Sequence, residues 1–372
     1  MRKLKIMSIF GTRPEAIKMA PVVKALEEDE KTESIVCVTA QHREMLDQVL
    51  DLFQIKPHYD LNIMKPGQTL SQITARALIG LEEVIKEVKP DMILVHGDTT
   101  TTFVGALAAF YNQVKVGHVE AGLRSHNMYS PYPEEMNRTL TGRMSHLHFS
   151  PTKGNEENLL REGIKEDIIT ITGNTVIDAL LEVVKDDYTY EDDRLNHIDY
   201  ENKKVILMTS HRRENLGQPM VNIFSAVKEV VEKNEEVEVV FPVHLNPKVR
   251  NLAYEILGDV ERVHLIEPLD YEPFANLIGK AYLILTDSGG IQEEAPALGK
   301  PVLVLRTETE RPEAVEAGTV KMAGIEKEEI LKLTNELIRD EKAYKKMANA
   351  VNPYGDGKAA KRIVEAIKRF LR

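Results

Sequence analysis

Acidic side chains follow two of the apolar runs that are typical of buried strands. Asp98 follows the run Met92–His96, and Glu120 follows the run Val114–Val119. Ligand-binding groups of open α/β sheets lie beyond the carboxyl ends of the strands, so we expect these two carboxylates to meet at one edge. Together with Glu134, in "YPEEMNR", they suit general acid–base chemistry where burial or neighbours raise a pKa. The alternative is a set of structural ion pairs with Arg124, Arg138 and Arg143, and the sequence leaves this choice open.

Basic side chains follow two other predicted strands. Arg13 and Lys18 lie in "FGTRPEAIKMAP", and His211 and Arg212 lie in "SHRRENLG". Helix N-termini and guanidinium groups favour anions, and histidine transfers protons near neutral pH. Both segments therefore suit a bound diphosphate, with a solvated basic turn as the alternative in each case.

The segment "LTDSGGIQEEAPALGKP" is the most informative one. Ser288, Gly289 and Gly290 follow a predicted strand and open a predicted helix. Glycines allow backbone N–H groups to approach a phosphate, and the N-terminus of a helix favours its charge. Glu294 lies one helical turn later, within reach of a ribose diol, and Arg311 lies near the same edge. This order predicts a nucleotide-diphosphate site, with an ordinary glycine-rich helix cap as the alternative.

Two series of short apolar runs must position these side chains. The runs are Leu4–Phe10, Ile35–Thr39, Met92–His96, Val114–Val119 and Ile168–Thr172, followed by Val205–Thr209, Val237–Pro242, Val263–Ile266, Tyr282–Thr286 and Val302–Leu305. Helix-length stretches such as Leu70–Val88 and Thr152–Glu162 separate them. This alternation is typical of buried parallel strands in βαβ units. We therefore predict two doubly wound, Rossmann-like α/β domains.

The two series of predicted strands are expected to form separate domains. We expect residues 1–173 to form the first domain and residues 174–357 the second, with a hinge near Gly173–Asn174. The charged segment 185–204 is expected to be a loop at the start of the second domain. Residues 358–372 carry apolar side chains at near-helical spacing, so we expect this C-terminal helix to pack back on the first domain.

Length and composition exclude several classes of protein. The chain has 372 residues, of which 42% are hydrophobic, and 48 Lys and Arg against 59 Asp and Glu give a formal charge of −11. No apolar run approaches the roughly 18–20 residues that span a bilayer, and the N-terminal segment does not read as a secretory signal. A single cysteine excludes an intramolecular disulfide framework. We expect a cytoplasmic protein with neither a membrane nor nucleic acid as its main partner.

Seven motifs, spread in order along the whole chain, together resemble one family. They are "FGTRPEAIKMAP", "GDTTTT", "HVEAGLR", "PEEMNR", "SHRRENLG", "DSGGIQEEAPALGKP" and "TERPEAVEAGT". The sequence is similar in these motifs to the non-hydrolysing UDP-N-acetylglucosamine 2-epimerases. The resemblance implies a GT-B-like fold with a cleft between the two domains, and reversible interconversion of UDP-N-acetylglucosamine and UDP-N-acetylmannosamine for polysaccharide biosynthesis. It also implies a homodimer without a metal, a nicotinamide or another cofactor.

The chemistry of the sugar explains the route that this family follows. Carbon 2 carries no adjacent carbonyl, so its proton is barely acidic, and the first strand is not followed by a dinucleotide fingerprint. The family's route is elimination of UDP to a 2-acetamidoglucal, followed by re-addition of UDP. That route requires a base for the C2 proton, an acid on the other face, and cations that hold the departing diphosphate.

The resemblance assigns roles to individual positions. Asp98, Glu120 and Glu134 match the acid–base carboxylates of the family, without deciding which one removes the proton. His211 matches the active-site histidine, which stabilises the departing phosphate or assists proton transfer. The positions that match substrate contacts are Arg13, Lys18, Phe274, Ser288, Gly289, Gly290, Glu294 and Arg311.

Bacterial members of the family also bind UDP-N-acetylglucosamine as an allosteric activator beside the active site. The matching positions are Gln41, His42, Gln68, Arg212 and His244. Glu44 and Gly67 depart from the pattern, because some members have Gln and Arg there. Allosteric activation is therefore a hypothesis for this chain.

Three other functions compete with this interpretation. A hydrolysing epimerase would use the same elimination but release UDP and free N-acetylmannosamine. A GT-B glycosyltransferase would use a similar phosphate turn and would need an acceptor site. A UDP-sugar sensor would share the fold without catalysis, although the set of carboxylates and His211 argues against a degenerate site.

Overall fold

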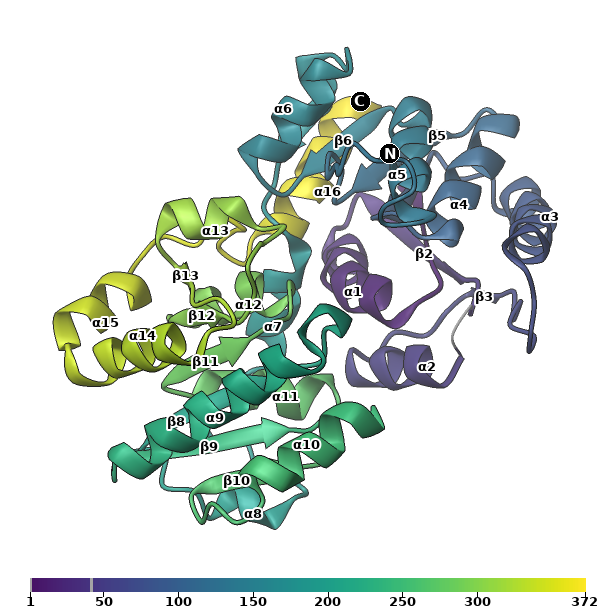
Figure 1. The fold of residues 1–372 in the computed structure, drawn as a ribbon. Helices are drawn as coiled ribbons and strands as arrows, with labels where there is room; N and C mark the ends of the chain where they lie inside the picture. The colour runs from purple at the N-terminus through teal and green to yellow at the C-terminus, as the bar shows by residue number, and fades with distance from the viewer. Residues whose placement is uncertain (1, 41–42) are drawn as a thin grey trace. The chain divides into compact units, whose positions relative to one another are not determined.

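The computed structural model describes residues 2–40 and 43–372 and divides into two compact units. Unit 1 comprises Met1–Leu181 and Tyr354–Arg372, and unit 2 comprises Glu182–Pro353. Each unit has its own parallel β-sheet with helices on both faces (Figure 1). The predicted class of two Rossmann-like α/β domains is thereby confirmed. The division falls within helix α7 (Thr175–Val183), a little beyond the expected hinge near Gly173.

The sheet of unit 1 has seven parallel strands in the order β3-β2-β1-β4-β5-β6-β7. The strands are β1 (Leu4–Phe10), β2 (Thr32–Val38), β3 (Tyr59–Asp60), β4 (Met92–His96), β5 (Lys115–Val119), β6 (Leu147–Ser150) and β7 (Ile169–Ile171). Nearly every residue of the central strands β1 and β4 is buried. Continuous burial of this kind is expected for a parallel sheet that is covered on both faces.

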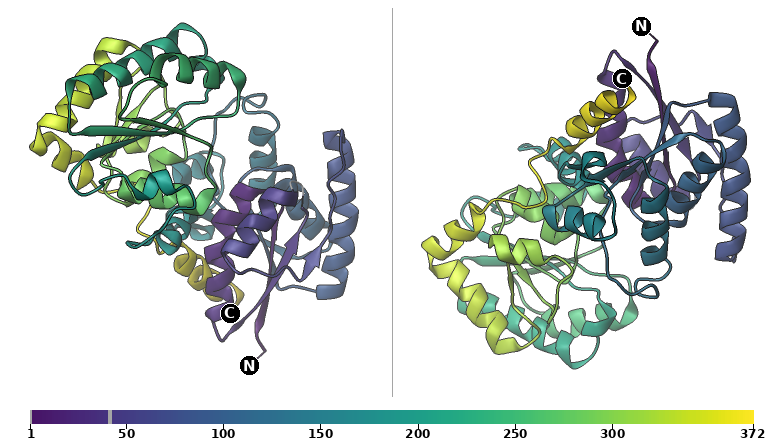
Figure 2. Two further views of the ribbon diagram at one scale, coloured as in Figure 1. Left: turned by 90° about the horizontal axis from the view of Figure 1, so that it is seen from below. Right: turned by 90° about the horizontal axis from the view of Figure 1, so that it is seen from above.

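Helices cover both faces of this sheet. They are α1 (Arg13–Glu28), α2 (Arg43–Leu52), α3 (Leu70–Val88), α4 (Thr100–Tyr111), α5 (Glu134–Met144), α6 (Lys153–Arg161), α7 and α16 (Ala359–Leu371), with a short 3₁₀ helix at Glu166–Ile168. One apolar core is formed by α3 and α4 against the strands. The C-terminal helix α16 packs on α1 (Figure 2, yellow beside purple), where Lys368 Nζ donates to Asp29 Oδ2 over 2.6 Å.

The sheet of unit 2 has six parallel strands in the order β10-β9-β8-β11-β12-β13. The strands are β8 (Lys204–Thr209), β9 (Val237–Pro242), β10 (Val263–Ile266), β11 (Leu283–Thr286), β12 (Val302–Val304) and β13 (Val320–Met322). The helices are α8 (Asp193–Asn196), α9 (Gln218–Lys233), α10 (Pro247–Leu257), α11 (Tyr271–Lys280), α12 (Ile291–Ala297), α13 (Pro312–Ala317), α14 (Lys327–Arg339) and α15 (Glu341–Ala348), with a short 3₁₀ helix at Arg213–Asn215. Side chains of α9, α10 and α14 form the main apolar core with the strands.

The charged segment 185–204, which was expected to be a loop, contains the short helix α8 and ends at the first residue of β8. Its tyrosines surround a lysine of α11. Lys280 Nζ donates to the backbone oxygen of Tyr188 over 2.9 Å and lies 5.0 Å from the ring centre of Tyr190 and 5.4 Å from that of Tyr200. These hydrogen-bond and cation–π contacts fix the segment to unit 2.

The strand order places a topological switch point in each sheet. In unit 1 the order reverses between β1 and β4, and in unit 2 it reverses between β8 and β11. Open α/β sheets bind ligands in the crevice beyond the carboxyl ends of the strands at this point. The loops that follow these four strands therefore hold the candidate site residues. None of the helices in the described ranges is long and apolar enough to cross a membrane.

Candidate active site

Glu15 joins the loops that follow β1 and β4. Its Oε2 accepts hydrogen bonds from the backbone nitrogens of Gly11 and Thr12, over 3.0 and 2.8 Å. Its Oε1 accepts from the hydroxyls of Thr99 and Thr102, over 2.6 and 3.1 Å. Glu15 is only 2% exposed, and it is the third residue of α1 in a capping-box position. The two loops at the switch point of unit 1 are thus held together by one buried carboxylate.

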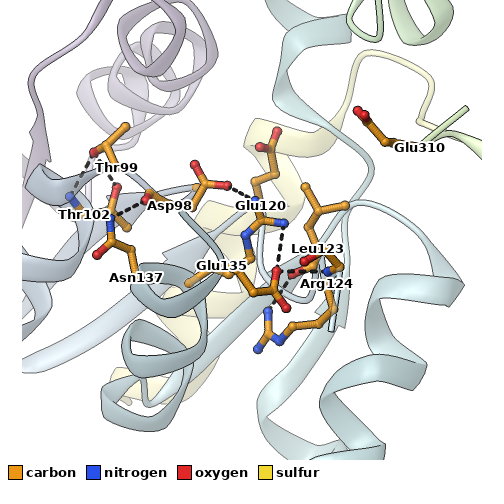
Figure 3. A network of polar contacts seen from close by, with 12 residues as sticks. Asp98, Thr99, Thr102, Glu120, Leu123, Arg124, Glu135, Asn137 and Glu310 are labelled. Carbon is orange, nitrogen blue, oxygen red and sulfur yellow. Dashed lines mark hydrogen bonds and ion pairs between the residues drawn. The ribbon is translucent and has the colours of Figure 1, made fainter. Parts of the chain in front are cut away.

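Asp98 lies in the loop after β4 and is held by the helix α5 (Figure 3). Arg138 Nη2 lies 2.7 Å from Asp98 Oδ2, and the side chain of Asn137 donates to the Asp98 backbone oxygen over 2.9 Å. Burial raises the pKa of Asp98 above its usual value, and the nearby charge of Glu120 adds to this rise. The cations Arg138 and Lys18 oppose the shift without cancelling it. Asp98 is therefore a carboxylate with a raised affinity for a proton.

Glu120 lies in the loop after the adjacent strand β5 and has a different environment. Its Oε2 forms an ion pair with Lys18 of α1, accepts a hydrogen bond from Asn174 Nδ2 over 3.0 Å and lies 3.6 Å from His96 Nε2. Burial alone would raise the pKa of Glu120, but Lys18 and His96 outweigh it and hold the pKa well below its usual value. Its backbone φ is +61°, a left-handed conformation that is uncommon for residues with a side chain.

The structure thus brings Asp98, Glu120 and Lys18 together at the switch point of unit 1 and gives the two carboxylates opposite proton affinities. Pairs of titratable groups whose environments push their pKa values apart are typical of sites that perform acid–base chemistry. The predicted substrate contact Arg13 lies at the first position of α1 and is half-buried.

The two acidic residues that open α5 have different surroundings. Glu135 is buried, accepts hydrogen bonds from the backbone nitrogens of Ser125 and His126, both over 2.9 Å, and lies 3.6 Å from Arg138. Glu135 therefore has a structural role, because it fixes a loop and an arginine. Glu134 is half-buried at the first position of the helix and makes no ion pair with the residues that the structure describes.

Unit 2 places His211 and Asp287 together at its own switch point. His211 follows β8, and Asp287 follows the adjacent strand β11. Asp287 Oδ2 accepts hydrogen bonds from the backbone nitrogens of His211 and Arg212, each over 2.9 Å. Burial lowers the pKa of His211 below its usual value, although the charge of Asp287 opposes the shift. His211 is therefore predominantly neutral at pH 7.

The predicted phosphate turn follows Asp287. Ser288, Gly289 and Gly290 connect β11 to α12, and a side chain on Gly290 would lie 3.8 Å from Glu294 Oε2. Glu294 also faces Tyr271 at the start of α11, where burial and then this carboxylate raise the pKa of the tyrosine well above its usual value.

Arg311, at the N-cap of α13, forms an ion pair with Glu293, and Phe274 is half-buried on α11. The structure therefore places Glu294 beside the glycine turn, whereas the guanidinium of Arg311 is engaged by an acidic residue of α12.

The positions assigned to allosteric activation are only partly described. Gln41 and His42 lie outside the described residues. Gln68 precedes α3 and accepts a hydrogen bond from Arg76 over 2.7 Å. In unit 2, the ring of His244 stacks on that of His211, with 5.7 Å between the ring centres. Arg212 Nε donates to the Asp287 backbone oxygen over 3.3 Å. His244 and Arg212 thus lie directly beside His211, one of the residues predicted to be catalytic.

Some residues that position the candidate site residues of unit 1 could not be identified from the sequence. The capping-box spacing from Thr12 to Glu15 signals the start of a helix, but it does not show that Glu15 also accepts hydrogen bonds from the threonines after β4. His96 is buried at the end of β4 and lies 3.6 Å from Glu120, and neither of its ring nitrogens makes a hydrogen bond to a described residue. Among the described residues, no group of three or more His, Cys, Asp or Glu side chains is arranged to hold a metal ion.

Comparisons with known proteins agree with these observations. A family model described as UDP-N-acetylglucosamine 2-epimerase matches residues 24–368. The UDP-N-acetylglucosamine 2-epimerase of Bacillus subtilis is 59% identical over 367 residues, which cover 99% of this chain and 96% of that protein.

Solved structures of proteins with this name are also similar. A crystal structure of a UDP-N-acetylglucosamine 2-epimerase matches with a TM-score of 0.93 and 56% identity, covering 100% of this chain and 98% of that one. The UDP-GlcNAc 2-epimerase of Neisseria meningitidis, crystallised with UDP-GlcNAc, matches with a TM-score of 0.86 and 53% identity, covering 98% of this chain and 100% of that one.

Proposed function

Because the chain belongs to the UDP-N-acetylglucosamine 2-epimerase family, we propose that it interconverts UDP-N-acetylglucosamine and UDP-N-acetylmannosamine by inverting C2 of the sugar. UDP-GlcNAc bound to the Neisseria meningitidis relative supports this choice of substrate. The observation that carries the proposal is the pair Asp98 and Glu120, two carboxylates on adjacent strand ends with oppositely shifted pKa values. Such a pair supplies one group that exchanges a proton and one that stays charged.

The proposed reaction is an elimination followed by an addition. A base removes the proton from C2 while the C1–O bond breaks, and UDP leaves with the electron pair of that bond. The C–H electrons form the C1=C2 double bond of a 2-acetamidoglucal. In the second half, an acid protonates C2 from the opposite face and a diphosphate oxygen of UDP bonds to C1, which restores the nucleotide sugar with C2 inverted.

We assign the proton transfer at one face of C2 to Asp98, because its raised pKa suits both removal and return of a proton. Glu134 is the candidate for the other face. Residues three and four positions apart share a helix face, so Glu134 lies on the same face of α5 as Asn137 and Arg138, which both contact Asp98.

Glu120 has a different role in this scheme. Lys18 and His96 hold it as a carboxylate, so it does not retain a proton near neutral pH. A fixed negative charge stabilises the positive character that develops at C1 as the C1–O bond breaks. The same charge orients Lys18 as a cation for the substrate.

Unit 2 supplies groups that suit the nucleoside diphosphate. The turn Ser288–Gly290 offers backbone N–H groups to a phosphate, and Glu294 suits the ribose diol. His211 follows β8 beside this turn, and its imidazole can exchange a proton with the diphosphate oxygen that leaves C1 and returns to it. The glycal is hydrolysed if water reaches it, so we propose that the intermediate is retained until UDP returns.

Product analysis tests this proposal against its competitors. The purified protein is incubated with UDP-N-acetylglucosamine, and nucleotides and sugars are quantified by chromatography. We expect UDP-N-acetylmannosamine at equilibrium with the substrate, little free UDP, and activity at least about 100-fold lower in Asp98→Asn.

Other outcomes would replace the proposal. Free UDP that accumulates together with N-acetylmannosamine identifies a hydrolysing epimerase. Turnover that depends on an added sugar acceptor identifies a glycosyltransferase. Binding of UDP-N-acetylglucosamine without any turnover identifies a sensor.

A further inference from the structure

Asp287 is a completely buried carboxylate whose two oxygens have different surroundings. It is 0% exposed. Besides the backbone nitrogens of His211 and Arg212, Oδ2 accepts hydrogen bonds from Ser210 Oγ over 3.2 Å and from Asn215 Nδ2 over 3.1 Å. All four groups donate, so the Oδ2 position must be occupied by an acceptor. These contacts fix the turn after β8 to the end of β11.

The second oxygen faces the imidazole ring of His211. Asp287 Oδ1 is buried and accepts no hydrogen bond from the described residues, and Nδ1 of His211 lies 3.3 Å from it. A lone pair on Nδ1 would face a carboxylate oxygen, which is a repulsive contact between two acceptors. A proton on Nδ1 removes this repulsion and gives the buried oxygen a donor after a small rotation of the ring.

We propose that Asp287 is a positioning residue that keeps the proton of neutral His211 on Nδ1 and leaves the lone pair of Nε2 available to the reacting groups. The catalytic use of His211 rests on the proposed function, whereas the assignment of its tautomer rests only on the contact with Asp287. In the addition half of the proposed reaction, Nε2 takes the proton of the diphosphate oxygen as that oxygen bonds to C1. In the elimination half, the protonated ring returns a proton to the oxygen as the C1–O bond breaks. A histidine with its proton on Nε2 would lack that acceptor.

The groups around His211 determine how it titrates. Asp287 and Glu214 favour the protonated ring, whereas His244 and Arg212 disfavour it, and burial is the largest effect and lowers the pKa. Loss of the Asp287 charge therefore lowers the pKa of His211 further. The side chain of His211 is 39% exposed, so a ligand or solvent can still reach the ring.

The experiment compares Asp287→Asn and Asn215→Ala with the unmodified protein. In Asp287→Asn, the four donors require the amide oxygen at the Oδ2 position, so the NH₂ group must occupy the Oδ1 position and donate to Nδ1. The proton of His211 then moves to Nε2. Asn215→Ala is the matched control, because it removes one of the four hydrogen bonds at Oδ2 and leaves Oδ1 facing His211.

The readout is ¹⁵N NMR of ring-labelled histidine as a function of pH, with the His211 signals identified by their loss in His211→Gln. We expect the Nδ1–H tautomer in the unmodified protein and in Asn215→Ala. We expect the Nε2–H tautomer and a titration midpoint at lower pH in Asp287→Asn. For the reaction we expect kcat to fall on the order of 100-fold in Asp287→Asn with KM little changed.

The tautomer and the activity test different claims. An Nε2–H tautomer in the unmodified protein overturns the proposal. This measurement needs no variant, so the proposal can be tested even if Asp287→Asn does not fold. An unchanged tautomer and midpoint in folded Asp287→Asn overturn it as well. If the unmodified protein lacks epimerase activity but shows the expected tautomer and its change, the proposed function fails and the positioning role stands.

Discussion

At the scale of single residues, Asp98 and Glu120 leave adjacent strands of one sheet, yet their surroundings shift their pKa values in opposite directions. Burial is the largest effect on the pKa of both groups, but at Glu120 the cation Lys18 and the imidazole of His96 together outweigh it. The intrinsic pKa values of aspartate and glutamate side chains differ little. The surroundings of Asp98 and Glu120 therefore decide which group exchanges protons and which stays charged.

Arg138 offers a direct test of this reasoning, because its guanidinium lowers the pKa of Asp98. Removal of that charge in Arg138→Gln raises the pKa further. A base must be deprotonated to act, so the acid limb of kcat/KM, in the direction from UDP-N-acetylglucosamine, should move to higher pH. The variant also leaves the buried Glu135 without a neighbouring cation, so we expect the free energy of unfolding to fall by about 3 kcal/mol.

The pH dependence is measured from steady-state kinetics, and unfolding is measured with urea. Arg143→Gln is the control, because Arg143 lies on the same helix but is exposed. Its acid limb should coincide with that of the unmodified protein. A limb in Arg138→Gln that moves to lower pH, or does not move, contradicts the assignment of Asp98 as the proton-exchanging group.

The sequence placed the carboxylates and cations at strand ends, and the structure has them there, but the partners of each group required the fold. Asn174 and His96 contact Glu120 only because β7 is followed by a loop near β5 and because β4 is adjacent to β5. Sheet order is a long-range property that strand patterns do not encode. For the same reason the choice for Asp98 between acid–base chemistry and a structural ion pair with Arg138 could not be made from the sequence.

At the scale of elements, the site residues depend on how closely the strand-to-helix turns approach one another. Gly11 shows this most clearly, because a Cβ atom there would lie 2.0 Å from Thr39 Oγ1 and 2.8 Å from Thr101 Oγ1. Only a residue without a side chain fits between β1, β2 and α4. The turn that carries Arg13 is thus fixed by a close approach rather than by a left-handed backbone.

Gly11→Ala should therefore destabilise the protein by about 1–3 kcal/mol through overpacking, and Thr39→Ala in the same chain should restore part of the loss. Gly142→Ala, in the last turn of α5, is the comparison, since its Cβ atom would lie 3.4 Å from its nearest neighbour. That variant should be neutral or stabilising, because alanine favours a helix. Urea unfolding measures all three variants, and equal stability of Gly11→Ala and Gly142→Ala would refute the packing argument.

The regular elements were predicted well where the apolar signal was continuous. The expected strands Leu4–Phe10, Met92–His96 and Val237–Pro242 and the helix Leu70–Val88 have the predicted bounds. The runs that were not proposed as strands are β3, β6 and β13, which have two to four residues and contain His, Lys or Asp. Such short runs form strands because a neighbouring strand already offers hydrogen bonds, and that context is absent from a local pattern.

At the scale of the whole molecule, each unit holds its own group of candidate residues at a switch point. Unit 1 holds the carboxylates and Lys18, and unit 2 holds His211 and the glycine turn. We propose that the active protein is a homodimer, as the family resemblance implies. Sedimentation equilibrium should give twice the mass of one chain, and the mass of a single chain would contradict this proposal.

Allosteric activation is a separate property of the whole molecule. If the proposed activator site is functional, initial rates in the direction from UDP-N-acetylmannosamine should depend sigmoidally on substrate, and traces of UDP-N-acetylglucosamine should make the dependence hyperbolic. Gln68→Ala should weaken this effect of the added sugar nucleotide. Hyperbolic kinetics without activator in the unmodified protein would exclude the regulatory hypothesis.

The central claim is that C2 is inverted through loss and return of its proton. The most direct measurement is proton NMR of UDP-N-acetylglucosamine incubated with the protein in D₂O. We expect UDP-N-acetylmannosamine to appear with deuterium at C2, the C2 proton signal of the substrate pool to disappear, and Asp98→Asn to suppress both changes. Formation of UDP-N-acetylmannosamine that retains the original C2 proton would contradict this mechanism.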